Sequence, residues 1–163
     1  GAIMAQETKL GKSGDDVMAL SMAVAEREAF LAEARIGVLS VPEEGRGPLS
    51  SPVWFDYLPG GDLWFLTQST ARKGKLLRPG LRVSLLVQET ASPYRYVSLE
   101  GPVAFIKPSD RLIDLQPMAQ RYLGEQAGID YAAVLAESYA EGNAIKVFIR
   151  PERWLTVDYA KEG

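Results

Sequence analysis

Short runs in which apolar and polar residues alternate cover most of the chain, and glycine, proline or charged turns end most of them. Alternation is typical of strands with one buried face, and such clusters are typical of turns. The pattern predicts six strands, over residues 36–41, 49–57, 63–67, 82–88, 94–106 and 144–158. The fifth is expected to be interrupted at Gly101-Pro102 and the last to break at Pro151. The strands predict a mostly β fold of the α+β class, a small antiparallel barrel with helices at its ends.

Helical spacing appears in four places. A first helix is expected over residues 16–34, and a short basic helix is expected between the third and fourth strands. A third helix begins near Asp110 and is expected to bend at Pro117, and a fourth covers residues 131–139. The apolar residues of the first and third helices at core spacing are Val17, Leu20, Val24, Phe30, Leu31, Leu112, Leu115, Ala119 and Tyr122.

Residues 1–14 are polar and contain glycine and serine, so they are expected to form a loose arm. Gly1-Ala2-Ile3 has the look of a cloning remnant before Met4. Residues 15–163 are then expected to form a single domain, which is long enough to bury a core.

The segment that carries the basic helix is the strongest candidate for a binding site. It places hydroxyls and cations directly after an apolar strand, in the order Thr67-Gln68-Ser69-Thr70-Ala71-Arg72-Lys73. Hydroxyls and free N–H groups at a helix N-terminus favour a bound anion, and the turn could supply the N-cap. On helical spacing Arg72, Lys75 and Arg78 share a solvated face, whereas Lys73 lies on the side of Leu76 and Leu77. A bound phosphate would give Lys73 a partner; the alternative is an ordinary polar turn before an amphipathic helix.

The second strand carries unusual residues on one face. Its alternation places Ser51, Val53 and Tyr57 on one side and Pro52, Trp54 and Asp56 on the other. Proline cannot donate to a ladder, which suits an edge where unpaired backbone could bind a polar ring while Trp54 covers an apolar surface. The alternative is a subunit contact that buries Trp54 without any ligand.

Composition excludes several classes of chemistry. The chain has 163 residues, a net charge of −3, no cysteine and no histidine. Disulfides, thiolate nucleophiles, Ser-His-Asp triads and zinc or haem sites that need these residues are therefore excluded, and no metal site is expected. The acidic balance argues against nucleic acid as the main partner, and no apolar run approaches the length of a membrane span. Without a signal peptide pattern, the cytoplasm is the expected location.

Over residues 30–159 the chain resembles the pyridoxamine 5'-phosphate oxidase-like superfamily of flavin-binding split barrels. The resemblance rests on Phe65-Leu66-Thr67, on Arg72-Lys73 and on Arg82-Val83-Ser84-Leu85-Leu86, in this order and spacing. It implies a six-stranded split barrel that forms a homodimer with two cofactor sites, each lined by both subunits. It also implies that Thr67, Arg72 and Lys73 hold the cofactor phosphate. The strand Ser51-Pro52-Val53-Trp54 would then lie against the ribityl chain and the ring.

Departures from the oxidases point to a particular branch of this superfamily. The oxidases carry an arginine and a histidine near the C-terminus that hold the substrate. The corresponding region here reads Pro151-Glu152-Arg153-Trp154-Leu155, and the chain has no histidine anywhere, so vitamin B6 oxidation is not expected. Asp56 replaces a lysine and Ser51 an arginine, whereas the basic segment adds Lys75 and Arg78. This pattern resembles the B group of actinobacterial flavin/deazaflavin oxidoreductases, which use coenzyme F420. The oligoglutamate tail of F420 needs such an extended cationic surface.

The resemblance implies an F420-dependent oxidoreductase that transfers hydride from the reduced deazaflavin to an unsaturated small molecule. Two alternatives remain, an FMN-dependent reductase or oxidase on the same fold and a carrier that holds F420 without turnover. Without His or Cys, a proton would have to come from solvent, a lysine, a tyrosine or a carboxylate, and Tyr96, Tyr57 and Asp56 are the candidates. Tyr96 could equally be a core or interface tyrosine. Trp154 and Arg153 could pack at an interface or cover the substrate.

Overall fold

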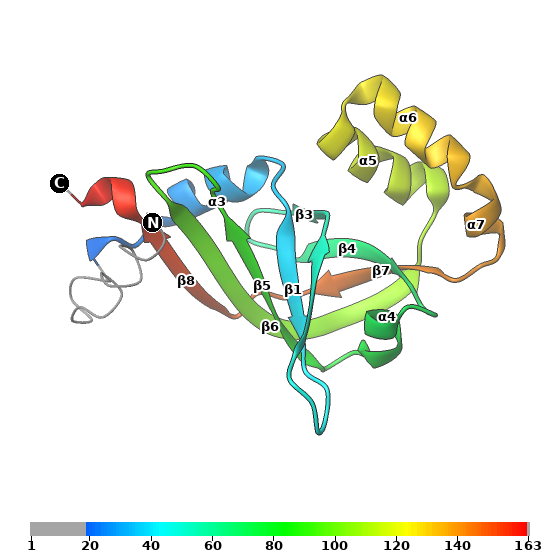
Figure 1. Ribbon diagram of the computed structural model, residues 1–163, viewed down its shortest axis with the longest axis horizontal. Coiled ribbons are helices and arrows are strands. Elements are labelled where there is room, and N and C mark those ends of the chain that lie inside the picture. The colour runs from blue at the N-terminus through cyan, green and yellow to red at the C-terminus, as the bar shows by residue number, and fades with distance from the viewer. Residues whose placement is uncertain (1–18, 163) are drawn as a thin grey trace.

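A computed structural model describes residues 19–162, and its centre is a curled antiparallel sheet (Figure 1). The eight strands are β1(Gly37–Val41), β2(Leu49–Val53), β3(Phe55–Tyr57), β4(Leu63–Gln68), β5(Arg82–Gln88), β6(Arg95–Pro108), β7(Ala144–Ile149) and β8(Arg153–Asp158). Their order is β2-β1-β5-β6-β7-β4-β3, with β8 paired to β6. The expected α+β class and antiparallel sheet are confirmed. The six expected strands become eight because the second divides at Trp54 and the last at 150–152.

The two edges of this sheet meet at Trp54. β2 pairs with β1 on one flank, β3 pairs with β4 on the other, and Trp54 alone separates β2 from β3. The sheet therefore curls into a half-barrel that opens where its two edge strands join. This opening, which we call the split, lies beside the residues that the sequence singles out as a ligand edge.

β6 connects the two halves of the half-barrel. Its first half pairs with β5 and β8, and its second half pairs with β7. The expected interruption at Gly101-Pro102 is wrong, because the strand continues through these residues and the register shift falls between Val103 and Phe105. Position 101 requires glycine because the backbone of Arg150 passes close to it, and a Cβ at this position would lie 1.8 Å from the carbonyl oxygen of Arg150.

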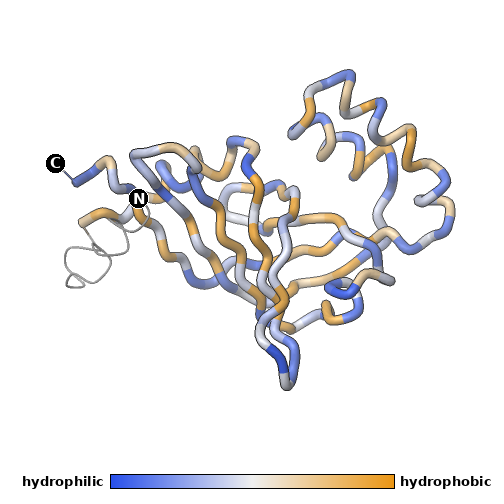
Figure 2. The backbone as a smooth tube through the Cα atoms, in the orientation of Figure 1, coloured by the Kyte–Doolittle hydropathy of each residue, from blue (hydrophilic) through white to orange (hydrophobic). Residues whose placement is uncertain are grey.

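The core fills the inside of the curled sheet. Its largest fully buried side chains are Phe30, Phe55, Phe65, Leu31, Leu39, Leu63, Leu85, Leu99 and Ile149. They come from alternate positions of the strands and from one helix, as the sequence pattern predicts. Figure 2 shows apolar residues along the strands and a hydrophilic loop between β1 and β2.

The first helix is shorter than expected. It is α3(Val24–Ala32), and of the expected apolar stripe Phe30 and Leu31 are buried whereas Val24 is exposed; Val17 and the arm 1–14 lie outside the described residues. The backbone before α3 bonds to β8, because Asp158 donates to Leu20 and Met22 donates to the Thr156 hydroxyl. These long-range bonds take the chain out of the helix.

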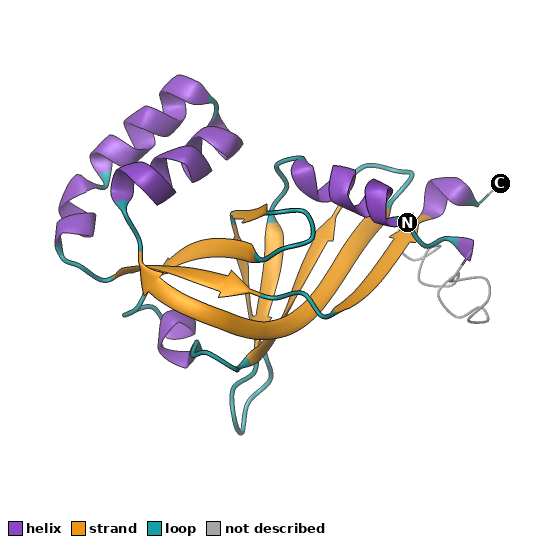
Figure 3. Cartoon of the chain, turned by 180° about the vertical axis from the view of Figure 1, so that it is seen from behind, coloured by secondary structure: helices purple, strands orange, loops and turns teal. Residues whose placement is uncertain are grey.

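The helices between β6 and β7 form a group at one end of the half-barrel (Figure 3). The π-helix η1(Arg111–Leu115) leads into α5(Gln116–Leu123), followed by α6(Glu125–Val134) and α7(Ala136–Ala140). The short helix α4(Arg72–Leu76) lies apart from this group, between β4 and β5, and a 3-10 turn η2(Tyr159–Lys161) follows β8 at the opposite end. Pro117 lies in the first turn of α5, where the missing N–H of proline costs no helix hydrogen bond. The expected bend inside the helix at Pro117 is therefore not needed. The expected helix over 131–139 is divided at Leu135 and begins earlier. No helix within residues 19–162 is long and apolar enough to span a bilayer.

Candidate functional site

The split carries a cavity that brings several of the predicted site residues together. The cavity has a volume of about 270 Å³, and its lining includes Pro52, Val53, Trp54 and Lys73. The Nζ of Lys73 donates a hydrogen bond to Ser51 Oγ at 3.1 Å. The structure therefore joins the edge strand and the basic segment at one place. We call it the Lys73 cavity.

Lys73 is half-buried in this cavity and has no acidic partner among residues 19–162, where a serine hydroxyl is its hydrogen-bond acceptor. Burial lowers the pKa of its ammonium, and no carboxylate opposes this effect. A half-buried cation with only a neutral partner favours an anion beside it. The donor set, an ammonium and a serine hydroxyl, suits a phosphate oxygen.

The helix that carries Lys73 differs from the sequence expectation. α4(Arg72–Leu76) has five residues, and its N-cap is Ala71, with no side-chain capping bond from the preceding hydroxyls. Leu77 is already extended, and Arg78 precedes Pro79, which disfavours helical backbone. The expected helix face of Arg72, Lys75 and Arg78 is therefore wrong, because Arg78 lies beyond the end of the helix.

α4 approaches β4 closely because one of its residues is glycine. A Cβ on Gly74 would lie 2.0 Å from the carbonyl oxygen of Gln68. This contact fixes α4 against the end of β4, and Lys73 is the residue immediately before it. The glycine thus determines where the lysine side chain starts.

Arg72 points to a different partner from Lys73. Its guanidinium forms an ion pair with Glu43 at 2.7 Å, across 29 residues of sequence. Glu43 lies in the loop between β1 and β2. A phosphate bound by Arg72 would have to share the guanidinium with this carboxylate, so Lys73 is the freer of the two cations.

The remaining residues of the basic segment surround α4 without forming a cap. Thr67 pairs with Ile145 in the β4–β7 ladder, and the Ser69 N–H donates to the Asn143 carbonyl at 2.8 Å. Thr70 is exposed, as are Lys75 and Arg78. The hydroxyls therefore lie around the turn, and the roles predicted for Thr67, Ser69, Thr70 and Ala71 stay predictions.

The wall opposite Lys73 comes from the strand β4 and from the helices. Leu66, Leu115, Met118 and Tyr131 complete the lining of the cavity, and the sequence analysis did not place any of them there. Leu115 was expected only as a core residue. The sequence carries no signal that Leu115 also lines a cavity, because helical spacing predicts which face of a helix is buried but not what packs against that face.

Trp54 lies in an aromatic cluster within its own chain. Its ring stacks on Tyr122 with centroids 5.1 Å apart and meets Tyr131 at 5.4 Å. The Tyr122 hydroxyl accepts from the Phe55 N–H at 3.0 Å and donates to the Arg35 carbonyl at 2.8 Å. Burial raises the pKa of this hydroxyl, so it keeps its proton as a donor. The α5 tyrosine thus holds the chain at the division between β2 and β3.

Arg121 fastens the same helix to the half-barrel. Its guanidinium donates to the carbonyl of Phe55 at 3.0 Å and to the carbonyls of Leu31 and Ala32, at the C-terminal end of α3. A cation there satisfies carbonyls that the helix leaves unpaired. Asp56 lies 3.6 Å from the same guanidinium. The helices therefore form a fixed wall of the cavity.

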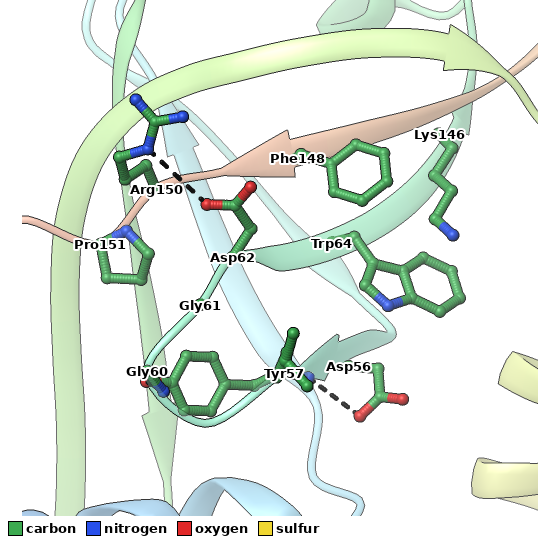
Figure 4. A pocket seen from close by; sticks show the side chains of 11 residues that line it. Asp56, Tyr57, Gly60, Gly61, Asp62, Trp64, Lys146, Phe148, Arg150 and Pro151 are labelled. Carbon is green, nitrogen blue, oxygen red and sulfur yellow. Dashed lines mark hydrogen bonds and ion pairs between the residues drawn. The ribbon is translucent and has the colours of Figure 1, made fainter.

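The candidate proton donors do not line the Lys73 cavity. Asp56 and Tyr57 line a second, larger hollow on the outer side of β3 and β4 (Figure 4). The Tyr57 hydroxyl accepts from the Gly60 N–H, and Asp56 accepts from the Tyr57 N–H. Tyr96 pairs with Gln88 and Val157 on the sheet, and burial raises the pKa of its hydroxyl. The roles of Asp56, Tyr57 and Tyr96 as proton donors therefore stay predictions.

The last strand turns its tryptophan inward. Trp154 packs against the core, meets Tyr57 edge-on at 5.9 Å, and lies under the Arg27 guanidinium at 3.8 Å. Arg153 is exposed and lies 3.6 Å from Glu100. Both Trp54 and Trp154 therefore have aromatic partners within the chain.

Fold and site together define a small α+β protein, with a curled antiparallel sheet and a cation-bearing cavity at its split. Residues 23–158 match the family model described as pyridoxamine 5'-phosphate oxidase. The chain belongs to this family, and the resemblance to the pyridoxamine 5'-phosphate oxidase-like superfamily is confirmed. No curated protein matches the chain in sequence.

Solved structures agree with the fold. The conserved hypothetical protein Rv2991 from Mycobacterium tuberculosis has a TM-score of 0.70 and 25% identity, over 89% of this chain and 90% of that one. An F420 reductase has a TM-score of 0.61 and 20% identity, over 78% and 94%. The FAD and heme binding protein from Mycobacterium smegmatis has a TM-score of 0.58 and 12% identity, over 85% and 72%. These likenesses show the fold that the family model indicates.

Proposed function

We propose that the chain is a homodimeric F420-dependent oxidoreductase that passes hydride to an unsaturated small molecule. The observation that carries this proposal is the half-buried ammonium of Lys73, whose hydrogen bond goes to Ser51 and which has no acidic partner among residues 19–162. The match to the pyridoxamine 5'-phosphate oxidase family and the likeness to an F420 reductase support it.

Residues of the split would bind and orient the cofactor. Lys73 and Ser51 would hold a phosphate oxygen, and the Pro52–Trp54 edge would lie along the ring. Leu66 and Met118 would exclude water from the apolar side of the cavity. When bound, the deazaflavin supplies the hydride, so the contribution of the chain is placement and a dry surrounding.

The choice of F420 over FMN rests on the cations outside the cavity. Lys75 and Arg78 are exposed, and neither forms an ion pair within the described part of the chain. They lie beyond Lys73 along the chain, where a trailing oligoglutamate could meet them. Each exposed cation would add about 0.2–1 kcal/mol, so the tail would tune the affinity rather than create it.

The proposed dimer has support in an apolar row on the outer face of the sheet. Pro52, Val38, Leu86 and Leu155 occupy one register line, with Ser98 between the last two. Val38, Leu86 and Leu155 are exposed. A row of this kind, with apolar residues on four of the five strands that it crosses, suits a second copy of the chain. Tyr96 lies two positions before Ser98 on β6 and therefore on the same face, which a second copy would cover.

The test is a titration of F420 into the parent and into Lys73→Ala, with Lys107→Ala as a matched control on β6. Loss of a hydrogen bond to a charged group should weaken binding by about 1.5–3 kcal/mol, which corresponds to roughly 10-fold to 150-fold. Lys107→Ala should leave the affinity unchanged, because Lys107 is exposed and lies outside the cavity lining. Equal affinity in Lys73→Ala and the parent would place the cofactor elsewhere. Binding of F420 without reduction of any enone or quinone would favour the carrier, and tighter binding of FMN would favour the flavin alternative.

A further inference from the structure

The second hollow has a volume of about 670 Å³, which is in the range of small-molecule sites. It lies on the outer side of the sheet, between the β3–β4 turn and the strand β7 (Figure 4). Trp64 and Leu66 are two positions apart on β4, and they line the hollow and the Lys73 cavity respectively. The two spaces are therefore separate but share one face of one strand.

The floor of this hollow is aromatic. Trp64 on β4 pairs in register with Phe148 on β7, so both rings project from the same face of the sheet. Phe105 stacks behind Phe148 with centroids 4.0 Å apart and planes 15° apart. A fixed floor of flat rings favours a planar ligand, because ring stacking adds to the burial of apolar area.

Four charged side chains, those of Asp56, Asp62, Lys146 and Arg150, line this hollow, and two of them pair with charged residues outside the lining. Lys146 forms an ion pair with the buried Asp114 at 2.9 Å, and its ammonium lies 4.1 Å from the Trp64 ring centre. The Asp56 carboxylate lies beside the Arg121 guanidinium. Asp56 therefore attracts a cationic ligand only weakly, and Lys146 attracts an anionic ligand only weakly, because each already has a partner of opposite charge.

Arg150 and Asp62 have only each other as charged partners among residues 19–162. The Arg150 side chain is 62% exposed, and this ion pair is a long contact of 3.9 Å made through Nε. Figure 4 shows its two terminal nitrogens turned away from Asp62. Those terminal N–H groups have the fork geometry that binds a carboxylate in two places. The free donor of the hollow is therefore cationic and prefers a planar anion.

We propose that this hollow is a second binding site, and that it takes a planar aromatic carboxylate with its ring on Trp64 and Phe148 and its carboxylate on Arg150. The site is built by β3, β4 and β7 and does not include Lys73. It goes beyond the proposed function, because it requires neither F420 nor the dimer.

The experiment is calorimetric titration of the full chain with 2-naphthoate, and with 2-naphthylmethanol and 2-naphthylmethylamine as neutral and cationic probes. The naphthoate should bind about twofold to fivefold more tightly than either of the others, the range for one exposed charged contact. Arg150→Gln should remove that preference. Arg153→Gln, an exposed arginine on β8 outside the hollow, should keep it.

Two further variants separate this site from the cofactor cavity. Trp64→Leu should weaken all three probes together, and a thermal scan shows whether that variant remains folded. Lys73→Ala should leave naphthoate binding unchanged, whatever it does to F420. Equal binding of the amine and the naphthoate, no effect of Arg150→Gln, or an equal effect of Arg153→Gln would overturn the proposal. Loss of naphthoate binding in Lys73→Ala would also overturn it, since the probe would then occupy the cofactor cavity.

Discussion

Removing the Tyr122 hydroxyl should loosen the wall of the Lys73 cavity without removing any of its apolar surface. In Tyr122→Phe the ring remains, so its stack on Trp54 is kept. The lost atom is the one that accepts from the Phe55 N–H and donates to the Arg35 carbonyl. Both backbone groups belong to the junction between α3, β1 and the division of β2 from β3.

The size of the effect follows from these two bonds. Each hydrogen bond contributes about 0.5–1.5 kcal/mol, and a donor left without a partner in a half-buried place costs about 1–3 kcal/mol. We therefore expect Tyr122→Phe to lower the free energy of unfolding by about 1–3 kcal/mol. For a chain of this length each kcal/mol corresponds to about 2–4 °C in Tm. Binding of F420 should weaken as well, because the Pro52–Trp54 edge is no longer held in place.

Urea unfolding followed by circular dichroism measures the first effect, and Tyr131→Phe is the matched control. Tyr131 also contacts Trp54, but its hydroxyl makes no hydrogen bond within residues 19–162. The control should unfold close to the parent. If both variants unfold at the same urea concentration, the hydroxyl does not hold the split, and the account of the cavity wall is wrong.

Three further outcomes are expected. Gly74→Ala should lower the free energy of unfolding by about 1–3 kcal/mol, the range for overpacking, because its Cβ meets the Gln68 carbonyl; Gly47→Ala, which meets nothing within 4 Å, should not, and urea unfolding compares them. The affinity for F420 should be highest at pH values below the lowered pKa of Lys73 and should fall as the pH rises through that pKa, because the cofactor phosphate binds the protonated ammonium. Titrations of F420 at several pH values would refute this if the affinity does not fall, or if it falls equally in Lys73→Arg. The double change Lys75→Gln, Arg78→Gln should weaken F420 by about 1 kcal/mol, more at low salt, and leave FMN unmoved; equal losses for both cofactors would argue against a tail contact.

Local patterns were enough to predict most of the sheet. The alternating run 82–88 coincides with β5, and the break at Pro151 separates β7 from β8. Turn residues and a period of two carry this information within a few positions of the chain. The family resemblance was also available from local motifs.

Long-range contacts explain where the expectations failed. The alternation in 49–57 continues through Trp54, and nothing local indicates that Tyr122, 67 residues after Phe55, bonds to the backbone there. Likewise Arg72 has the spacing of a phosphate ligand, but Glu43 lies across from it in the fold. The sequence does carry a signal for the end of α4, because Pro79 disfavours helical backbone at Arg78. The predicted helix face through Arg78 did not take this signal into account.

The central claim is that the Lys73 cavity holds a deazaflavin. The most direct test is a side-by-side titration of the purified parent chain with F420 and with FMN, in one buffer and at two salt concentrations. The account predicts that F420 binds more tightly than FMN, and that the difference shrinks as salt rises. Tighter binding of FMN, or no binding of F420 at either salt concentration, would contradict it.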